Sequence, residues 1–172
     1  METVPERGRI CIHNRSHYEE GLGGRVHPEI LQSQRLPKDA GVDGSIWKRR
    51  FAEINAFERH LVDNGTIVLK FFLHVSKAEQ KRRFLKRIDD PSKNWKFSAD
   101  DLVKRKQWDA YMEAYAAMCE RTSTKWAPWH VVPADRNSVR NAAVTELLVD
   151  ALDRLHMEWP ALDPAVKALT VE

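Results

Sequence analysis

The residues best suited to chemistry lie near the start of the sequence, in the tripeptide Asn14-Arg15-Ser16. An arginine side chain presents five donors in a planar fork that matches the oxygens of a phosphate group. The tripeptide follows residues 10–13, where isoleucine alternates with Cys and His, a pattern that predicts a short buried strand. Ligands of open α/β sheets bind beyond the carboxyl ends of the strands. Arg15 is therefore a candidate phosphate ligand, and the alternative is a surface turn with a solvated arginine.

A second candidate site is a dense group of cations further along the chain. Residues 77–87 hold six cations in eleven positions, and the stretch Lys93-Asn94-Trp95-Lys96 mixes cations with an aromatic ring. Residues 104–106 add three more cations in the early turns of a predicted helix, where the helix dipole disfavours positive charge. A bound anion would offset that cost. Polyanion binding and a merely solvated basic face both remain open.

The elements that must position these residues alternate between strand and helix. Apolar side chains at helical spacing predict helices over residues 45–64, 77–88, 99–121 and 138–157. The apolar run 66–75 predicts a strand buried on both faces, as in a parallel sheet, and residues 127–133 predict another strand. Ser76 and Glu79 predict a capping box at the start of the basic helix, and Ser98 and Asp101 a second one.

Gly21, Gly23 and Gly24 are three glycines in four residues, and this density predicts a flexible connection because each glycine costs a helix about 1 kcal/mol. A phosphate-cradling loop is the alternative. The G-x-x-x-x-G-K-[ST] spacing of such a loop does not occur in this sequence, which favours the connection.

Length and composition predict a single α/β domain. The chain has 172 residues, 42% of them hydrophobic, and a net charge of +3. Cys11 and Cys119 fit no disulfide or metal pattern and predict free buried thiols in a reducing compartment. There is no apolar stretch of about 20 residues and no apolar signal core at the N-terminus, so we expect a cytoplasmic protein without a membrane partner.

Several separate motifs occur in an order that resembles one known family. They are Asn-Arg-Ser-His-Tyr-Glu-Glu, Arg-Val-His-Pro-Glu, Phe-Glu-Arg-x-Leu, Lys-Phe-Phe-Leu-His-Val-Ser-Lys, Asp-Pro-x-Lys-x-Trp-Lys-Phe-Ser and Pro-Trp-His-Val-Val-Pro-Ala-Asp. From about Pro5 to Leu155 the chain resembles the second family of polyphosphate kinases, the polyphosphate:nucleotide phosphotransferases. The resemblance implies phosphoryl transfer between polyphosphate and a nucleoside mono- or diphosphate, with Mg²⁺ as cofactor.

The resemblance also implies a fold and a set of roles. The fold would be a P-loop kinase-like three-layer αβα domain over residues 1–157, with a parallel sheet, a helical lid at about 77–121 and a tail at 158–172. The Walker-B-like motif of the family matches Asn14-Arg15-Ser16, which would be catalytic. The residues that would bind polyphosphate are Arg25, Lys81, Arg82, Lys93, Trp95, Lys96 and Arg105.

Two departures from the family pattern shape the remaining expectations. No Walker A loop precedes the Asn-Arg-Ser motif, so the first strand of the fold and the expected metal-binding Asp are missing. Glycines at 21, 23 and 24 replace the valines usual in the family, which suggests relaxed constraint or a flawed gene sequence. We therefore expect an N-terminally truncated, inactive member of the family. The alternatives are a non-catalytic polyphosphate-binding remnant or partner subunit, and a small RNA-binding protein. No nucleic acid partner is expected under the main hypothesis, and homo-oligomerisation stays open.

Overall fold

The computed structural model describes residues 4–14, 16–36 and 45–167. In this part of the chain two parallel strands, β1 (Lys70–His74) and β2 (Trp129–Pro133), pair in register from Lys70 opposite Trp129 to His74 opposite Pro133. The helices are α1 (Tyr18–Val26), α2 (Pro28–Gln32), α3 (Ser45–Asp63), α4 (Lys77–Asp89), α5 (Ala99–Lys106), α6 (Trp108–Thr122), α7 (Asn137–Asp153) and α8 (Pro164–Lys167), with a 3₁₀ turn η1 (Asn94–Lys96). The α/β class and the parallel pairing are confirmed, and the missing first strand stays a prediction.

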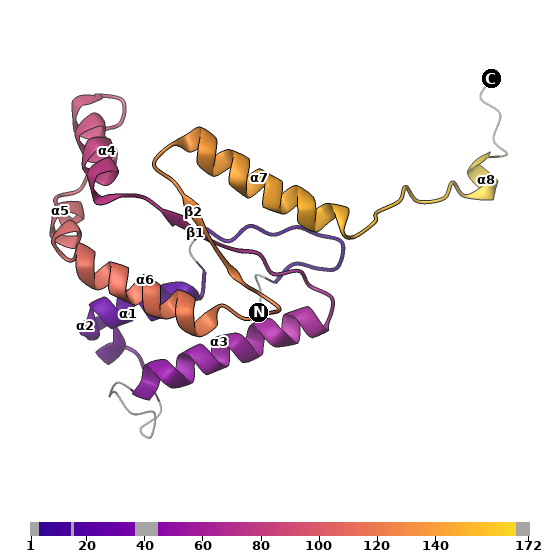
Figure 1. Ribbon diagram of the computed structural model, residues 1–172, viewed down its shortest axis with the longest axis horizontal. Coiled ribbons are helices and arrows are strands. Elements are labelled where there is room, and N and C mark those ends of the chain that lie inside the picture. Colours follow the sequence, from indigo (N-terminus) through magenta and orange to yellow (C-terminus); the bar gives the residue numbers. More distant parts are fainter. Residues whose placement is uncertain (1–3, 15, 37–44, 168–172) are drawn as a thin grey trace.

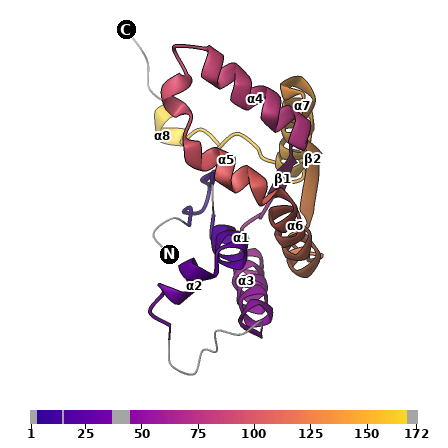
Figure 2. The same cartoon turned by 90° about the vertical axis from the view of Figure 1, so that its left-hand side faces the viewer.

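The helices lie on both sides of the two strands. Figure 1 shows α7 above the strands and α6, α1 and α3 below them, while α4 and α5 stand at one end of the molecule. The turned view in Figure 2 shows α4 and α5 as the two arms of a hairpin that projects from the body. Within the described residues, none of the helices has the length and apolar character needed to cross a bilayer.

The hydrophobic core lies where α1, α3 and α6 meet one edge of the strands. Tyr18, Phe51 and Met118 are buried there, and the partly buried rings of Trp47 and Trp129 pack against them. These residues come from α1, α3, α6 and β2, so burial of one apolar cluster joins four elements that are far apart in sequence. The helix predicted over 45–64 is confirmed as α3, whose apolar face contributes Phe51 and Trp47.

The glycine-rich segment is not a flexible connection, and that prediction is wrong. It is the middle of α1, and the reason is close packing. A Cβ atom on Gly24 would lie 3.1 Å from the Trp47 ring, and one on Gly21 would lie 3.4 Å from the Phe51 ring. A Cβ on Gly24 would require the Trp47 ring to shift by a few tenths of an ångström, so the lack of a side chain there favours the close approach of α1 to α3. The burial gained there offsets the poor helix propensity of glycine.

The predicted strand at residues 10–13 is also wrong. These residues have no regular secondary structure, and Ile10 and Ile12 are 69% and 87% exposed. A strand needs backbone partners on a neighbouring strand, and the sheet of the described residues contains only β1 and β2. Cys11 is exposed rather than buried, which corrects the prediction for that thiol, and Cys119 is half-buried.

Two further predictions need correction in detail. β1 covers only Lys70–His74, and its last two residues are exposed, so it is not buried on both faces. The helix predicted over 99–121 is interrupted at Gln107, which ends α5 and precedes α6. Ser98 and Asp101 form the predicted capping box. The Ser76 hydroxyl accepts a hydrogen bond from the Glu79 amide, but the Glu79 carboxylate pairs with arginines instead of closing the box.

Candidate functional site

The basic cluster of the sequence lies on one structural unit, the α4–α5 hairpin, which we define as residues 77–106. Its two arms are joined at both ends. The rings of Phe84 and Phe97 meet edge to face with their centroids 5.7 Å apart. At the open end the Arg105 guanidinium donates to the Lys77 carbonyl oxygen at 2.8 Å and to Gln80 Oε1 at 2.6 Å. Arg105 therefore braces the hairpin from inside.

The hairpin has a larger net positive charge than the whole protein. Residues 77–106 contain eleven Lys and Arg against five Asp and Glu, a net charge of +6, while the whole chain carries +3. The rest of the chain is therefore net negative. Solubility alone does not require the positive charge to be concentrated on one projecting unit. The concentration therefore favours a polyanionic ligand at that unit.

Lys81 and Arg82 present their charges to solvent on α4. Lys81 forms no ion pair within the described part of the chain, and the Arg82 side chain is 64% exposed. The Arg82 fork donates to both carboxylate oxygens of Glu79, at 2.6 and 2.7 Å. Together with Arg83 it holds the pKa of Glu79 at about 2, well below the ordinary value of 4.5. Glu79 is thus ionised at every physiological pH and orders the two arginines.

The tip of the hairpin combines an exposed aromatic ring with two cations. Trp95 is 74% exposed, and its indole Nε1 donates to the Ser92 carbonyl oxygen at 3.0 Å. The Lys96 ammonium lies 4.9 Å from the centre of the Trp95 ring, and Lys93 pairs with Asp90. The ring is therefore held in one orientation with a cation against it, an arrangement that suits contact with a polymer.

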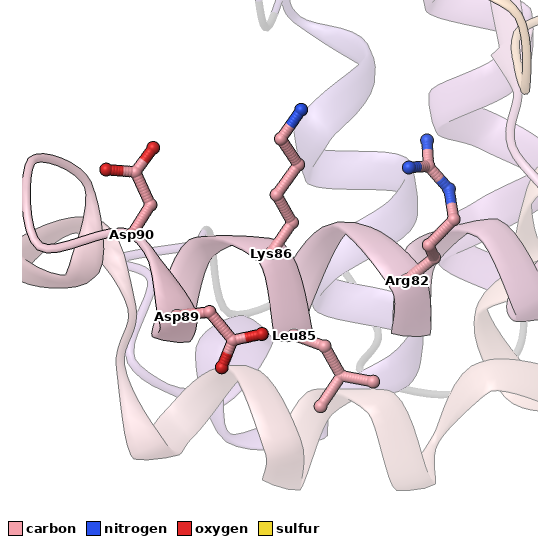
Figure 3. Close-up of a pocket in the computed structure, with 5 residues that line it drawn as sticks. All are labelled: Arg82, Leu85, Lys86, Asp89 and Asp90. Atoms are coloured by element: carbon pink, nitrogen blue, oxygen red, sulfur yellow. The ribbon is translucent and has the colours of Figure 1, made fainter.

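A shallow hollow of about 410 Å³ lies along the outer side of α4. Figure 3 shows the side chains of Arg82, Lys86 and Asp90 pointing to the same side of the helix, with Leu85 and Asp89 on its other side. The mixture of signs means that the outer side of α4 is not uniformly basic. The negative side chains lie at the tip end, so an extended anion is favoured along the first turns of α4.

Asn14 and Ser16 are not part of this unit. Arg15 lies outside the described residues, and residues 4–13 contain no strand. Among the hydrogen bonds and ion pairs of the described residues, none joins Asn14 or Ser16 to the hairpin. Arg25 is exposed in the last turn of α1, also on the body. Lys81, Arg82, Lys93, Trp95, Lys96 and Arg105 thus belong to one hairpin, whereas Asn14, Ser16 and Arg25 belong to other segments.

The structure also contains a buried polar network that the sequence did not predict. The Lys70 ammonium donates to Glu58 Oε2 at 2.7 Å, to the Thr122 carbonyl oxygen at 2.7 Å and to the Tyr18 hydroxyl at 3.0 Å. Tyr18 in turn donates to Glu58 Oε1 at 2.5 Å. The sequence did contain a signal, because Lys70 interrupts an apolar run and Glu58 lies on the apolar face of α3.

The charges in this network are strongly perturbed by their surroundings. Burial on its own would raise the pKa of Glu58, but the donors of His17, Lys70 and Tyr18 outweigh it and hold that pKa below its usual value. Burial lowers the pKa of Lys70, and the bond to Glu58 opposes the fall. Burial and the Glu58 carboxylate raise the pKa of the Tyr18 phenol. The Lys70–Glu58 pair therefore anchors β1 to α3 as a buried salt bridge, and the Tyr18 hydroxyl joins the start of α1 to it.

Comparisons with known proteins agree with this picture. The family model described as polyphosphate kinase 2 matches residues 1–160. The chain belongs to the polyphosphate kinase 2 family. An ADP-polyphosphate phosphotransferase of Rhodopseudomonas palustris is 48% identical over 162 residues, which cover 94% of this chain and 56% of that protein. An AMP/ADP-polyphosphate phosphotransferase of Meiothermus ruber is 43% identical, over 99% of this chain and 60% of that protein.

A solved structure gives the same result for the fold. The crystal structure of polyphosphate kinase 2 from Arthrobacter aurescens TC1 superposes with a TM-score of 0.86 at 43% identity, over 96% of this chain and 55% of that one. The family predicted from the motifs is therefore confirmed. The chain spans somewhat more than half the length of these relatives.

Proposed function

We propose that this chain takes part in phosphoryl transfer between inorganic polyphosphate and a nucleoside mono- or diphosphate, and that the α4–α5 hairpin holds the polyphosphate. The observation that carries the proposal is the net +6 charge of the hairpin in a chain of net +3. The names of the Rhodopseudomonas and Meiothermus relatives support the substrate classes, since they specify polyphosphate with ADP, or with AMP and ADP.

The arrangement suits the demands of this reaction. Phosphoryl transfer needs its reactants positioned and their negative charge neutralised, with little covalent work from the protein. Lys81 and Arg82 on the first turns of α4, with Lys93 and Lys96 at the tip, would hold successive phosphates of a chain. Arg15 is proposed to contact the transferring phosphoryl group together with Asn14 and Ser16, and this role rests on the family motif.

The unit proposed to move is smaller than the lid predicted from the sequence. α6 belongs to the body, because its residues Ala114 and Met118 are buried and it packs against α1 and α3. We propose that residues 77–106 act as the lid within a domain at 1–157, followed by the tail at 158–172. Gln107, which separates α5 from α6, is then the junction between lid and body.

The divalent cation that the family implies has no ligand set in the described part of the chain. No three side chains of His, Cys, Asp or Glu gather there into a group that could hold a metal ion. We therefore assign Mg²⁺ no residue in this region, and the proposal for the hairpin concerns charge neutralisation by Lys and Arg alone.

Binding of long-chain polyphosphate at several salt concentrations tests the proposal. Replacing Lys81, Lys93 and Lys96 by Gln removes three hairpin charges, and replacing the exposed Lys48, Lys125 and Arg136 by Gln removes three charges elsewhere. For polyanion binding each lost contact lowers the slope of log affinity against log salt by roughly 1. We expect the hairpin variant to lose about 2 to 3 of this slope and the control variant to keep it.

Two outcomes would contradict the proposal. Equal slopes for the hairpin and control variants would show that the basic cluster is a solvated face. Single-stranded RNA that displaced polyphosphate at equal phosphate concentration would favour the RNA-binding alternative. A coupled assay of ATP formation from ADP and polyphosphate separately tests the expectation that this chain alone does not turn over.

A further inference from the structure

The base of α4 is fastened to the loop that follows β2, and these contacts belong to no role described so far. The Ala134 amide donates to the His74 carbonyl oxygen at 2.9 Å, which extends the pairing of β1 and β2 by one step. The Ser76 amide donates to Asp135 Oδ1 at 2.7 Å. The residue before α4 is thus held by a carboxylate from the end of the neighbouring strand.

Arg83 provides the third and central contact. Its Nε donates to Glu79 Oε1 at 2.7 Å within α4. Its Nη2 donates to the carbonyl oxygens of Ala134 at 2.7 Å and Asp135 at 3.2 Å. The guanidinium group therefore spans from the first turn of α4 to the backbone beyond β2. Arg83 is also less exposed than Arg82, with 32% against 64% of its side chain accessible.

We propose that Arg83 is a positioning residue whose guanidinium clamps the base of α4 to the loop after β2 and so sets the direction in which Lys81 and Arg82 face an extended polyanion. This inference rests on the proposed function of the hairpin. Glu79 contributes to this arrangement twice, because its carboxylate accepts hydrogen bonds from both Arg83 and Arg82. One partly buried contact thereby orders one ligand-facing arginine.

The chemistry of the clamp requires arginine and not merely a positive charge. Three acceptors surround the guanidinium, a carboxylate oxygen and two carbonyl oxygens, and they are reached by two different nitrogens of one rigid plane. A lysine has a single nitrogen and cannot span acceptors on two separate elements. Arg83→Lys therefore keeps the charge of the hairpin and removes the clamp, which separates positioning from simple attraction.

The test compares Arg83→Lys with Arg87→Lys, the same substitution one turn further along α4. Amide hydrogen exchange measures how firmly α4 is held against the loop after β2. Polyphosphate titration at several salt concentrations measures how well the hairpin binds the polyanion. We expect α4 amides of the Arg83→Lys protein to exchange about tenfold faster, as loss of a charged hydrogen bond predicts, with no change in α3 or α6. Its polyphosphate affinity and salt slope should both fall although no charge is removed, and Arg87→Lys should match the parent protein.

The outcomes distinguish the inference from the function on which it rests. Unchanged α4 exchange in Arg83→Lys would overturn the clamp. Faster exchange with parental polyphosphate affinity would overturn the positioning role and leave a structural contact. A parent protein that bound no polyphosphate would refute the proposed function. The exchange data would still test whether Arg83 holds α4 to the loop after β2. If Arg83→Lys did not fold, Glu79→Ala, which removes the carboxylate that Arg82 and Arg83 share, would take its place. Faster α4 exchange than in the parent is then expected, and parental exchange would overturn the clamp.

Discussion

The buried Lys70–Glu58 pair allows a quantitative prediction about stability. Lys70 and Glu58 side chains are 5% and 1% exposed, and their charged atoms lie 2.7 Å apart. At an effective dielectric constant of about 20, two unit charges at that separation attract by about 6 kcal/mol, and the cost of removing both from water opposes most of this. The net worth of the pair is therefore modest, but the cost of breaking it is not.

Lys70→Met would leave the Glu58 carboxylate buried with its main partner gone, and would also strip the Thr122 carbonyl oxygen of its donor. Breaking a buried pair in this way typically costs about 3–5 kcal/mol. For a domain of this size 1 kcal/mol corresponds to roughly 2–4 °C in Tm, so we expect a fall of about 6–20 °C. Chemical denaturation followed by circular dichroism measures the free energy of unfolding directly.

A matched control and a double variant make this prediction sharp. Lys104 and Asp100 are also 2.7 Å apart, but their side chains are 54% and 60% exposed, so Lys104→Met should cost far less than Lys70→Met. Combining Glu58→Gln with Lys70→Met removes both charges, and we expect the double variant to be more stable than the sum of the two single losses by about 1–3 kcal/mol. Equal costs for Lys70→Met and Lys104→Met would refute the reasoning, as would additive losses in the double variant.

Two other predictions concern α1 and α4. Gly24→Ala should destabilise the protein by about 1–3 kcal/mol, because its Cβ would lie 3.1 Å from the Trp47 ring. Gly23→Ala, whose Cβ would lie 3.7 Å from Ile30, should be neutral or stabilising by up to about 1 kcal/mol. Thermal unfolding ranks the two variants, and the reverse order would contradict the packing argument. Since the pKa of Glu79 is lowered from 4.5 to about 2, its bonds to Arg82 and Arg83 stabilise α4 above pH 4.5 and are lost as the pH falls toward 2. Hydrogen exchange of α4 should therefore accelerate over that range, more than in Glu79→Gln, and equal acceleration in both proteins would contradict this assignment.

The elements that the sequence predicted well are those in which local pattern and tertiary packing agree. α3 and α7 are regular helices with apolar residues at helical spacing, and the basic helix begins at Ser76, as its capping pattern predicts. The basic cluster also lies on one unit, because most of its members are close in sequence. Local information was sufficient wherever the partners of a residue are its neighbours in the chain.

The errors occur where a distant segment determines the local structure. Glycines at 21 and 24 disfavour a helix by propensity, yet the rings of Trp47 and Phe51, more than twenty residues away, make their lack of a side chain an advantage. Conversely, the alternation at residues 10–13 favours a strand, but no strand of the described residues pairs with it. The polar network of Lys70 was missed for the same reason, since Glu58, Tyr18 and Thr122 approach it only in the folded chain.

The two ends of the β1 segment have contrasting electrostatics, and this contrast links the fold to the proposed function. At its start, Lys70 is buried and its charge is balanced by Glu58 inside the protein. Just beyond its end, Arg83 is bound by Glu79 and two carbonyl oxygens, while Lys81 has no ionic partner in the described chain. The buried charge of the body is thus paired within the protein, where it joins one element to another. The excess positive charge remains on the hairpin. A fold that neutralises its core cations and leaves its projecting ones unbalanced is suited to a ligand that supplies the missing negative charge.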